Sequence, residues 1–577
     1  MTKYSLTDLI DLPLKDCMDS SGNYSDDDSM KASHKMNEAI ESSKSMTQQV
    51  HPLSEFKGFH KQLIPTEALK EGEQYRFHFN AQKCIGCQCC VVACSEQNNN
   101  PHDVNWRRVG ELEAGKFPYT RKFYLSMGCN HCIEPSCMAG CPTNAYEKDP
   151  VTGIVRHMAD SCIGCGYCQW NCPYGVPQFN HERKIVTKCD MCYGRLAENN
   201  APACAEACPE NAITIEKVNI SEWVENHDKA DAPGMPDSDQ TLSTTKITLP
   251  KGMPSKGTAV NEFRFNPEHA HPTLIIFLTL SQLAVGGFIA LWFFDIFHRF
   301  TDSHSLLKQF GGLFSGAMLF ISALALNTAV FHLGRPIYAF KAVKMWRTSW
   351  LSREVLLFGI FGFLAFLYGG LWLDELYLNF LSFPDSIRTL LGSLVAISGL
   401  AGIFSSAYIY MVPARPAWNT PNTALRFFMT TFILGPSFAI MVMLASQKLQ
   451  SEALLSFPYL YLNLGLMIFS TVIQLFILSS TFFYMSQTKD RELKGTAILL
   501  TTRFRYHLIA RMGLLILGGL ILPIALIYTI THEGNYNTLF WFSLVNFTVL
   551  LGSEMIGRYL FFVSVIPKNM AGTYFTK

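Results

Sequence analysis

The chain has 577 residues, enough for two or more domains, and its formal net charge is +1. A charge this close to zero gives no reason to expect a nucleic-acid partner. The average composition conceals two different halves. The cysteine-rich part ends at Cys208, and long apolar runs without any cysteine follow from about Thr273.

The first 70 residues are rich in Ser, Asp, Lys, Met and Gln, so they can bury little apolar surface. We therefore expect a disordered extension over 1–70. It contains no basic stretch followed by an apolar core and no twin-arginine pair, so no cleavable secretion signal is expected. Cys17 stands alone in this segment, and we interpret it as an incidental free thiol.

Residues 71–215 carry four groups of cysteines. The run FYLSM within them and the run AITIEKV, which begins at Ala212, predict strands. Repeated CxxC groups favour metal binding over a secreted disulfide framework. Residues 216–270 are polar and rich in Pro, Gly, Ser, Thr and Lys, which predicts an extended connector lying on a surface.

Sixteen cysteines in four motifs are candidate metal ligands. The third motif, CIGCGYCQWNCP, has the full x2-x2-x3 spacing of iron–sulfur proteins, with Pro after its last Cys. The last Cys of such a motif often ligates a second cluster, so two motifs together form two clusters. The motifs are Cys84, Cys87, Cys90 and Cys94; Cys129, Cys132, Cys137 and Cys141; Cys162, Cys165, Cys168 and Cys172; and Cys189, Cys192, Cys204 and Cys208.

Structural zinc is the alternative for these cysteines. Zinc often binds two CxxC pairs, but it does not require CxxCxxCxxxC followed by Pro. We therefore predict four [4Fe–4S] clusters. Cys89 breaks the spacing of the first motif, and we interpret it as a non-ligand, although it competes with Cys90 if the loop slips by one residue. Spacing alone leaves open which motifs pair.

Eight apolar segments follow within residues 271–577. Each is long enough to cross a hydrocarbon layer of ~30 Å, which needs about 20 helical residues. Tryptophans near the segment ends argue against the alternative, buried helices of a large soluble protein. The segments are 273–297, 311–332, 355–374, 388–411, 427–445, 458–484, 507–530 and 538–563.

Lys and Arg are distributed unequally between the two sides of these segments. The side that bears the cysteine-rich domain has fourteen, and the opposite side has four: Arg299, Lys308, Arg388 and Lys448. The positive-inside rule then places the cysteine-rich domain in the cytoplasm. The fourteen are Arg335, Lys341, Lys344, Arg347, Arg353, Arg415, Arg426, Lys489, Arg491, Lys494, Arg503, Arg505, Lys568 and Lys577.

The runs YLSMGCNHCIEPSCMAGCPTNAY, CIGCGYCQWNCPYGVPQFN and TKCDMCYGRLAENNAPACAEACP resemble the iron–sulfur subunit of dimethyl sulfoxide reductase-type molybdoenzymes, over about 75–215. The resemblance implies that motif one pairs with motif four, and motif two with motif three. The implied ligand sets, ordered from the catalytic subunit towards the membrane, are Cys84/Cys87/Cys90/Cys208, Cys94/Cys189/Cys192/Cys204, Cys129/Cys132/Cys137/Cys172 and Cys141/Cys162/Cys165/Cys168. Some relatives have Trp at the position of Cys165 and a three-iron cluster, so Cys165 implies four irons.

The runs PEHAHPTLIIFLTLSQLAVGGF, FHLGRPIYAFKAVKMWRTSWLSREVLLFG, YMVPARPAWNTPNTALRFF and GSEMIGRYLFFVSVIP resemble the membrane anchor subunit of the same enzymes. The chain thus looks like a fusion of two subunits that are usually separate. We expect an α+β bis(4Fe–4S) ferredoxin-like domain with four cubane clusters, followed by an all-α eight-helix transmembrane bundle. The implied partner is a molybdopterin-containing catalytic subunit.

Five ionisable residues are candidates for a quinol site. Glu554 and Arg558 are four residues apart on the last segment and can pair, either at a functional site or as a structural clamp. His332 could accept a quinol proton or only cap a helix, and the resemblance favours the first role. Arg353 and Glu354 begin the next segment, as partners of His332 or as interfacial anchors.

The histidines of this half, His271, His298, His332 and His507, are scattered near segment ends, so no b-type haem is expected. We expect the chain, in a bacterial inner membrane, to pass electrons from menaquinol or ubiquinol to the molybdenum subunit, which reduces an oxide-type substrate. Reverse flow from a dehydrogenase to quinone stays open, because cluster potentials depend on surroundings. A transporter with an iron–sulfur regulatory domain is a further alternative, weakly supported by Gly435–Pro436 and Pro523.

Overall fold

A computed structural model describes residues 63–115, 118–250, 258–298, 304–378, 380, 384–450, 457–532, 535–570 and 572. Most of the expected disordered extension, including Cys17, lies outside these residues. Residues 63–70 depart from that expectation. The Leu63 side chain is buried, and its carbonyl oxygen accepts a hydrogen bond from the Ile215 amide at 2.8 Å.

Two three-stranded sheets form the framework of the cysteine-rich domain. In the first, alternating burial places Phe77 and Phe79 in the core. The strands FYLSM and AITIEKV, expected from the sequence, lie in β3 and β8 and are confirmed. The first sheet has the order β8-β1-β9, from Ile213–Asn219, Glu73–Asn80 and Lys246–Thr248. The second has the order β10-β2-β3, from Thr258–Ala259, Arg108–Ala114 and Arg121–Met127.

The cysteine motifs lie on short elements that connect these strands. The helices are α3 (Cys89–Asn98), α4 (Ser136–Ala139), the 3-10 helix η2 (Ala159–Ser161), α5 (Tyr167–Asn171), α6 (Tyr193–Ala197) and α7 (Ala203–Glu206). The hairpins are β4–β5 (Tyr146–Lys148 and Val155–His157) and β6–β7 (Gln178–Asn180 and Ile185–Thr187).

Residues 216–270 contain more regular structure than the expected extended connector. They supply the end of β8, helix α8 (Ile220–Glu225), the 3-10 helices η3 (His227–Ala230) and η4 (Ser238–Gln240), and strands β9 and β10. Trp223 is buried, and its Nε1 donates to the Ser243 carbonyl at 2.8 Å. Because β9 pairs with β1 and β10 pairs with β2, this segment adds one strand to each sheet.

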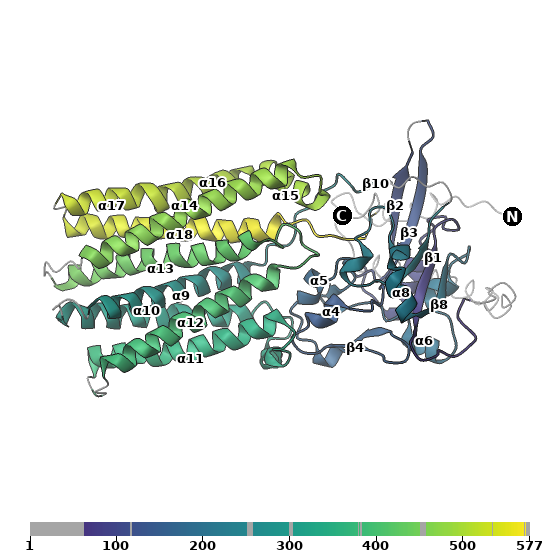
Figure 1. The fold of residues 1–577 in the computed structure, drawn as a ribbon, viewed down its shortest axis with the longest axis horizontal. Coiled ribbons are helices and arrows are strands. Elements are labelled where there is room, and N and C mark those ends of the chain that lie inside the picture. Colours follow the sequence, from purple (N-terminus) through teal and green to yellow (C-terminus); the bar gives the residue numbers. More distant parts are fainter. Residues whose placement is uncertain are drawn as a thin grey trace, which may run out of the picture. The chain divides into compact units, whose positions relative to one another are not determined.

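Eight helices within the described residues are long and apolar enough to cross a membrane, which confirms the expected number of spans. They lie side by side in Figure 1. Their elements are α9 (Pro272–His298), α10 (His304–Val330), α11 (Trp350–Tyr377), α12 (Asp385–Tyr410), α13 (Pro421–Gln450), α14 (Phe457–Gln487), the run α16 (Arg505–Ile516), η6 (Leu517–Ile521) and α17 (Leu522–Thr531), and α18 (Tyr536–Val563).

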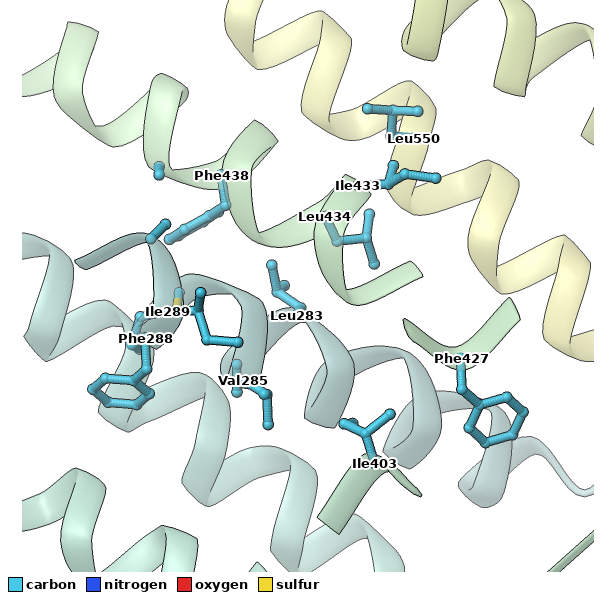
Figure 2. Packing of buried hydrophobic residues seen from close by; sticks show 14 of the residues in the cluster. Leu283, Val285, Phe288, Ile289, Ile403, Phe427, Ile433, Leu434, Phe438 and Leu550 are labelled. Atoms are coloured by element: carbon cyan, nitrogen blue, oxygen red, sulfur yellow. The ribbon is translucent and has the colours of Figure 1, made fainter. Parts of the chain in front are cut away.

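Helix α9 is the most buried of the eight spans. Figure 2 shows its residues Leu283 and Phe288 among the apolar side chains of α12, α13 and α18. Gly286 of α9 and Gly435 of α13 meet backbone to backbone, since a Cβ on either would collide with the other helix. Small residues at a helix crossing allow this close approach. Gly435 therefore has a packing role, which does not require a broken transporter helix.

Two further helices lie outside the spans, on the side of the cysteine-rich domain. The 3-10 helix η5 (Pro336–Val343) follows α10, and α15 (Arg491–Thr501) follows α14. The Asp490 side chain caps α15 by accepting hydrogen bonds from the amides of Glu492 and Leu493.

The two halves meet at the third cysteine motif. The Gly334 amide donates to the Gly164 carbonyl at 3.1 Å, and the Arg335 amide donates to the Ile163 carbonyl at 3.0 Å. Gly164 has a φ of +70°, and a Cβ on Gly334 would collide with the Lys184 carbonyl oxygen. Both glycines are therefore required by a backbone-to-backbone contact between the halves.

Trp170 of the same motif enters an aromatic cluster of the helical half. Its ring centroid lies 5.5 Å from Tyr410, 5.6 Å from Trp418 and 5.6 Å from His271. Such aromatic pairs add to the free energy of apolar burial by about 0.5–1.5 kcal/mol each. Trp170 thereby anchors the iron–sulfur domain to the bundle.

We expect Gly334→Ala to lower the thermal unfolding midpoint of the detergent-solubilised chain. The added methyl group would force the halves apart and cost about 1–3 kcal/mol of packing free energy. Gly552→Ala on α18 is the matched control, because a Cβ at Gly552 meets open space. Equal midpoints for the two variants would refute the role given to this contact.

Candidate functional site: four cysteine sets and an adjoining apolar cavity

The structure brings the sixteen motif cysteines together in four sets. Two sets each line a small cavity, and in the other two the thiols lie close enough to influence one another's charge. The sets are Cys84, Cys87, Cys90 and Cys208; Cys94, Cys189, Cys192 and Cys204; Cys129, Cys132, Cys137 and Cys172; and Cys141, Cys162, Cys165 and Cys168. These are the sets that the resemblance implies.

The exchange of cysteines between sets follows from local helix geometry. Cys90 and Cys94 are buried one turn apart on α3, and they belong to the first and second sets. Cys168 lies on α5 and Cys172 directly follows that helix, and they belong to the fourth and third sets. One helical turn therefore holds two neighbouring sets at a short separation.

The loop at the start of each motif turns sharply around its first thiol. Gly86, His131, Gly164 and Met191 each stand two residues after a first cysteine, and all have positive φ. Three of their amides donate to the sulfur, at 3.5 Å to Cys129, 3.4 Å to Cys162 and 3.4 Å to Cys189. The left-handed backbone turns the amide towards the sulfur, and hydrogen bonds to sulfur tune an iron–sulfur cluster.

The donor sets fit an iron–sulfur cluster better than single ions. Each set has four thiols, with amide donors directed at several of the sulfurs. Among the described residues, no three His, Cys, Asp or Glu side chains are placed to hold one metal ion. Burial raises the pKa of Cys132 and of Cys165 to about 12, so these thiols must lose protons when they bind metal.

Two buried cations lie between neighbouring sets, and the sequence analysis missed both. Arg107 interacts electrostatically with Cys90 of the first set and Cys204 of the second. Lys188 lies between the second and third sets, and its Nζ donates to Cys129 Sγ at 3.7 Å. The position of Lys188 directly before Cys189 was the available signal, but a lysine there is equally compatible with an exposed loop.

A second kind of site adjoins the fourth set. An apolar cavity of about 260 Å³ lies at the junction of the two halves, and Cys165, His332 and Glu354 all contribute to its lining. Leu274, Phe277 and Phe358 of the bundle provide apolar walls, and Tyr167 and Trp170 of α5 close the side towards the cysteines. A mostly apolar cavity with a few convergent polar groups is typical of small-molecule sites.

The polar groups of this cavity are positioned by their helices. His332 follows the last turn of α10, and its Nδ1 faces the Ala329 carbonyl oxygen. Glu354 is buried in the first turns of α11. Arg353, the third candidate in this region, is not among the lining residues. Its guanidinium stacks on the Trp350 ring at 4.2 Å and donates to the carbonyl of Trp346 at 3.0 Å.

Glu554 and Arg558 do not line this cavity. They are joined through Thr430, which donates to Glu554 Oε2 at 2.7 Å and accepts from Arg558 Nη2 at 3.2 Å. Gln474 donates to the other carboxylate oxygen at 2.7 Å, and Gln282 accepts from Arg558 at 2.7 Å. The two residues share a face, as expected, but side chains of three other helices connect them.

Comparison with known families agrees with both halves. Residues 120–218 match a 4Fe-4S dicluster domain, and residues 268–563, about half of the chain, match the DMSO reductase anchor subunit (DmsC). The protein belongs to the DMSO reductase anchor subunit family. It joins this anchor to an iron–sulfur electron-transfer domain in one polypeptide, which confirms the expected fusion of two subunits.

Relatives of the iron–sulfur half are similar over most of their own length. One component of the anaerobic dimethyl sulfoxide reductase of Haemophilus influenzae is 36% identical over 156 residues, 26% of this chain and 76% of the relative. Its counterpart in Escherichia coli K12 is 39% identical over 148 residues, 24% and 72%. A component of the sulfite dehydrogenase of Allochromatium vinosum is 37% identical over 150 residues, 22% and 62%.

In this anchor–iron–sulfur fusion, we expect Lys188→Gln to lower the reduction potential of a cluster. The reduced cluster is the more negative state, so loss of a buried cation disfavours it by roughly 2 kcal/mol at an effective dielectric constant near 20. This energy corresponds to a decrease in reduction potential on the order of 100 mV. Potentiometric titration followed by EPR measures the shift. Lys184→Gln, which changes an exposed lysine, should leave all potentials unchanged. Equal potentials for both variants, at equal iron content, would contradict the role of Lys188.

Proposed function

We propose that this chain oxidises a quinol at the cavity beside Cys165 and passes the electrons through four [4Fe–4S] clusters to a separate molybdopterin-containing catalytic subunit. The observation that carries the proposal is the lining of that cavity by Cys165, His332 and Glu354 together. When bound, each cluster accepts and donates one electron, and its potential is tuned by its surroundings. The sixteen motif cysteines hold the four clusters in the sets described above.

The cavity's polar groups suit the proton chemistry of a quinol, which releases two protons as it loses two electrons. Because His332 Nδ1 donates to the Ala329 carbonyl, Nε2 is left as the acceptor. Burial lowers the pKa of His332, so the ring is neutral near pH 7 and able to take a proton. Glu354 is the second candidate acceptor, and the apolar walls hold the quinol ring.

Glu554, Arg558 and Arg353 take no direct part in this proposal. None of the three lines the cavity, and the first two are already engaged with Thr430, Gln474 and Gln282. We assign Glu554 and Arg558 to the clamp that connects α18 with α9, α13 and α14. Arg353 acts as an interfacial anchor through its stacking on Trp350.

The reductase direction is supported by the relatives from anaerobic dimethyl sulfoxide reductases, and implies an S- or N-oxide as final substrate on the catalytic subunit. The excess of Lys and Arg on the side of the iron–sulfur domain supports a bacterial inner membrane with that domain in the cytoplasm.

Replacing His332 by Ala should slow quinol-driven reduction of the clusters by at least about 100-fold, because a positioned general base contributes that much. Glu354→Gln should slow it in the same direction. Reduction by dithionite, which bypasses the cavity, should proceed at the wild-type rate. His507→Ala is the matched control, since His507 is exposed and lines no part of the cavity. Wild-type quinol oxidation by both cavity variants would remove this cavity from the mechanism.

The similarity to a sulfite dehydrogenase component favours one alternative, electron flow from a dehydrogenase to quinone. Redox titration of the four clusters separates the two directions. Quinol oxidation requires clusters with potentials near or above that of the quinone couple. If all four lie far below that couple, the chain works in the reverse direction.

A further inference from the structure

A second cavity lies in the bundle, between α13, α14, α15, α16 and α18. Its volume is about 170 Å³, and it shares no lining residue with the cavity beside Cys165. Most of its wall is apolar, including Leu478, Phe482 and Leu500. Two guanidinium groups, those of Arg426 and Arg511, also line it. This second cavity is therefore not part of the proposed path of electrons from the quinol to the clusters.

Positive charge exceeds negative charge around this cavity. Arg426, Arg511 and Arg558 all interact with the carboxylate of Glu554, and the guanidinium groups of Arg426 and Arg558 also feel the repulsion of Arg511. Three cations therefore share one anion, whose oxygens already accept hydrogen bonds from Thr430 and Gln474. Within the described residues, no ion pair joins Arg426 or Arg511 to an acidic side chain.

One hydrogen-bond donor of each of these two arginines, the Nε atom, is also left without a partner among the described residues. The Nε atoms of Arg426 and Arg511 are buried and have no hydrogen-bond partner in the described part of the chain. Arg511 is 6% exposed, and its guanidinium lies against the backbone of Gly557, where a Cβ would come 2.5 Å from Cζ. The fold thus makes room for this cation at the cavity wall. Three buried cations that share a single anion are unfavourable, so this arrangement calls for a ligand that brings negative charge.

The cavity lies at one end of the membrane-spanning helices. Met485 stands near the end of α14, Leu508 in the first turn of α16, and Ser564 directly after α18. These are the span ends on the side of the iron–sulfur domain. Helix α15 supplies Thr496 and Leu500 to the wall. At this depth a phospholipid presents its phosphate, and its acyl tails can follow apolar side chains into the bundle.

We propose that this cavity binds the phosphate of an anionic membrane phospholipid, held by Arg426 and Arg511, with the acyl tails against the apolar wall. The lipid provides the negative charge that the arginine cluster lacks. It also joins α13, α16 and α18 at their membrane-surface ends. This lipid site is separate from the quinol cavity. Lipid binding to it is measured without any electron-transfer assay.

Native mass spectrometry of the purified full-length chain, delipidated in detergent, tests this site. Phosphatidylglycerol should bind at least about tenfold more tightly than phosphatidylcholine, inorganic phosphate or glycerol 3-phosphate. Arg511→Gln and Arg426→Gln should each weaken phosphatidylglycerol binding about tenfold, because each removes a charged hydrogen-bond donor. Arg503→Gln is the matched control, since Arg503 is exposed on the same side and does not line the cavity.

Leu508→Trp is a second variant that keeps both arginines and fills the cavity with a larger apolar side chain. It should displace phosphatidylglycerol even if Arg511→Gln fails to fold. Equal affinity of Arg511→Gln and Arg503→Gln, or no preference over phosphatidylcholine, would overturn the proposal. Inorganic phosphate binding as tightly as phosphatidylglycerol would overturn the lipid assignment. Wild-type lipid binding by Leu508→Trp would place the lipid elsewhere.

Discussion

The contact between the third cysteine motif and the segment after α10 positions the cysteine sets relative to the helical bundle and its apolar cavity. Two backbone hydrogen bonds, from Gly334 to Gly164 and from Arg335 to Ile163, hold a cysteine loop directly against the bundle. Glycines at 164 and 334 remove the Cβ atoms that would separate the two backbones. Cys165 is the next residue along the loop, so it faces the apolar cavity as a direct result of this contact.

The segment that connects the two halves is also part of the folded iron–sulfur domain. Strands β9 and β10 attach the connecting segment to both sheets of the iron–sulfur domain, while Trp170 extends from the cysteine loop into the aromatic cluster of the bundle. Joining two binding partners in one polypeptide raises their effective concentration and fixes their ratio at one to one. The backbone contacts at the junction bring Cys165 directly to the wall of the cavity.

One electrostatic rule explains features of both halves. Buried cations are tolerated where negative charge lies close by. In the iron–sulfur domain, Arg107 and Lys188 stand between sets of thiols, whose metal-bound forms carry negative charge. In the bundle, Glu554 balances only one of three arginines, and the remaining positive charge borders a cavity that can admit an anion. The domain thus stabilises reduced clusters, and the bundle attracts an anionic ligand.

The sequence by itself determined the class of each half. Cysteine spacing predicts iron–sulfur ligands, and apolar runs of about 20 residues predict spans, because both signals lie within short stretches of the polypeptide. The tertiary structure alone decided how distant residues meet. It placed His332 and Glu354 in one cavity with Cys165, left Arg353 outside, and linked Glu554 to Arg558 through Thr430. Helical periodicity shows which residues share a face of one helix, but not which helix packs against that face, since that depends on contacts between residues far apart in sequence.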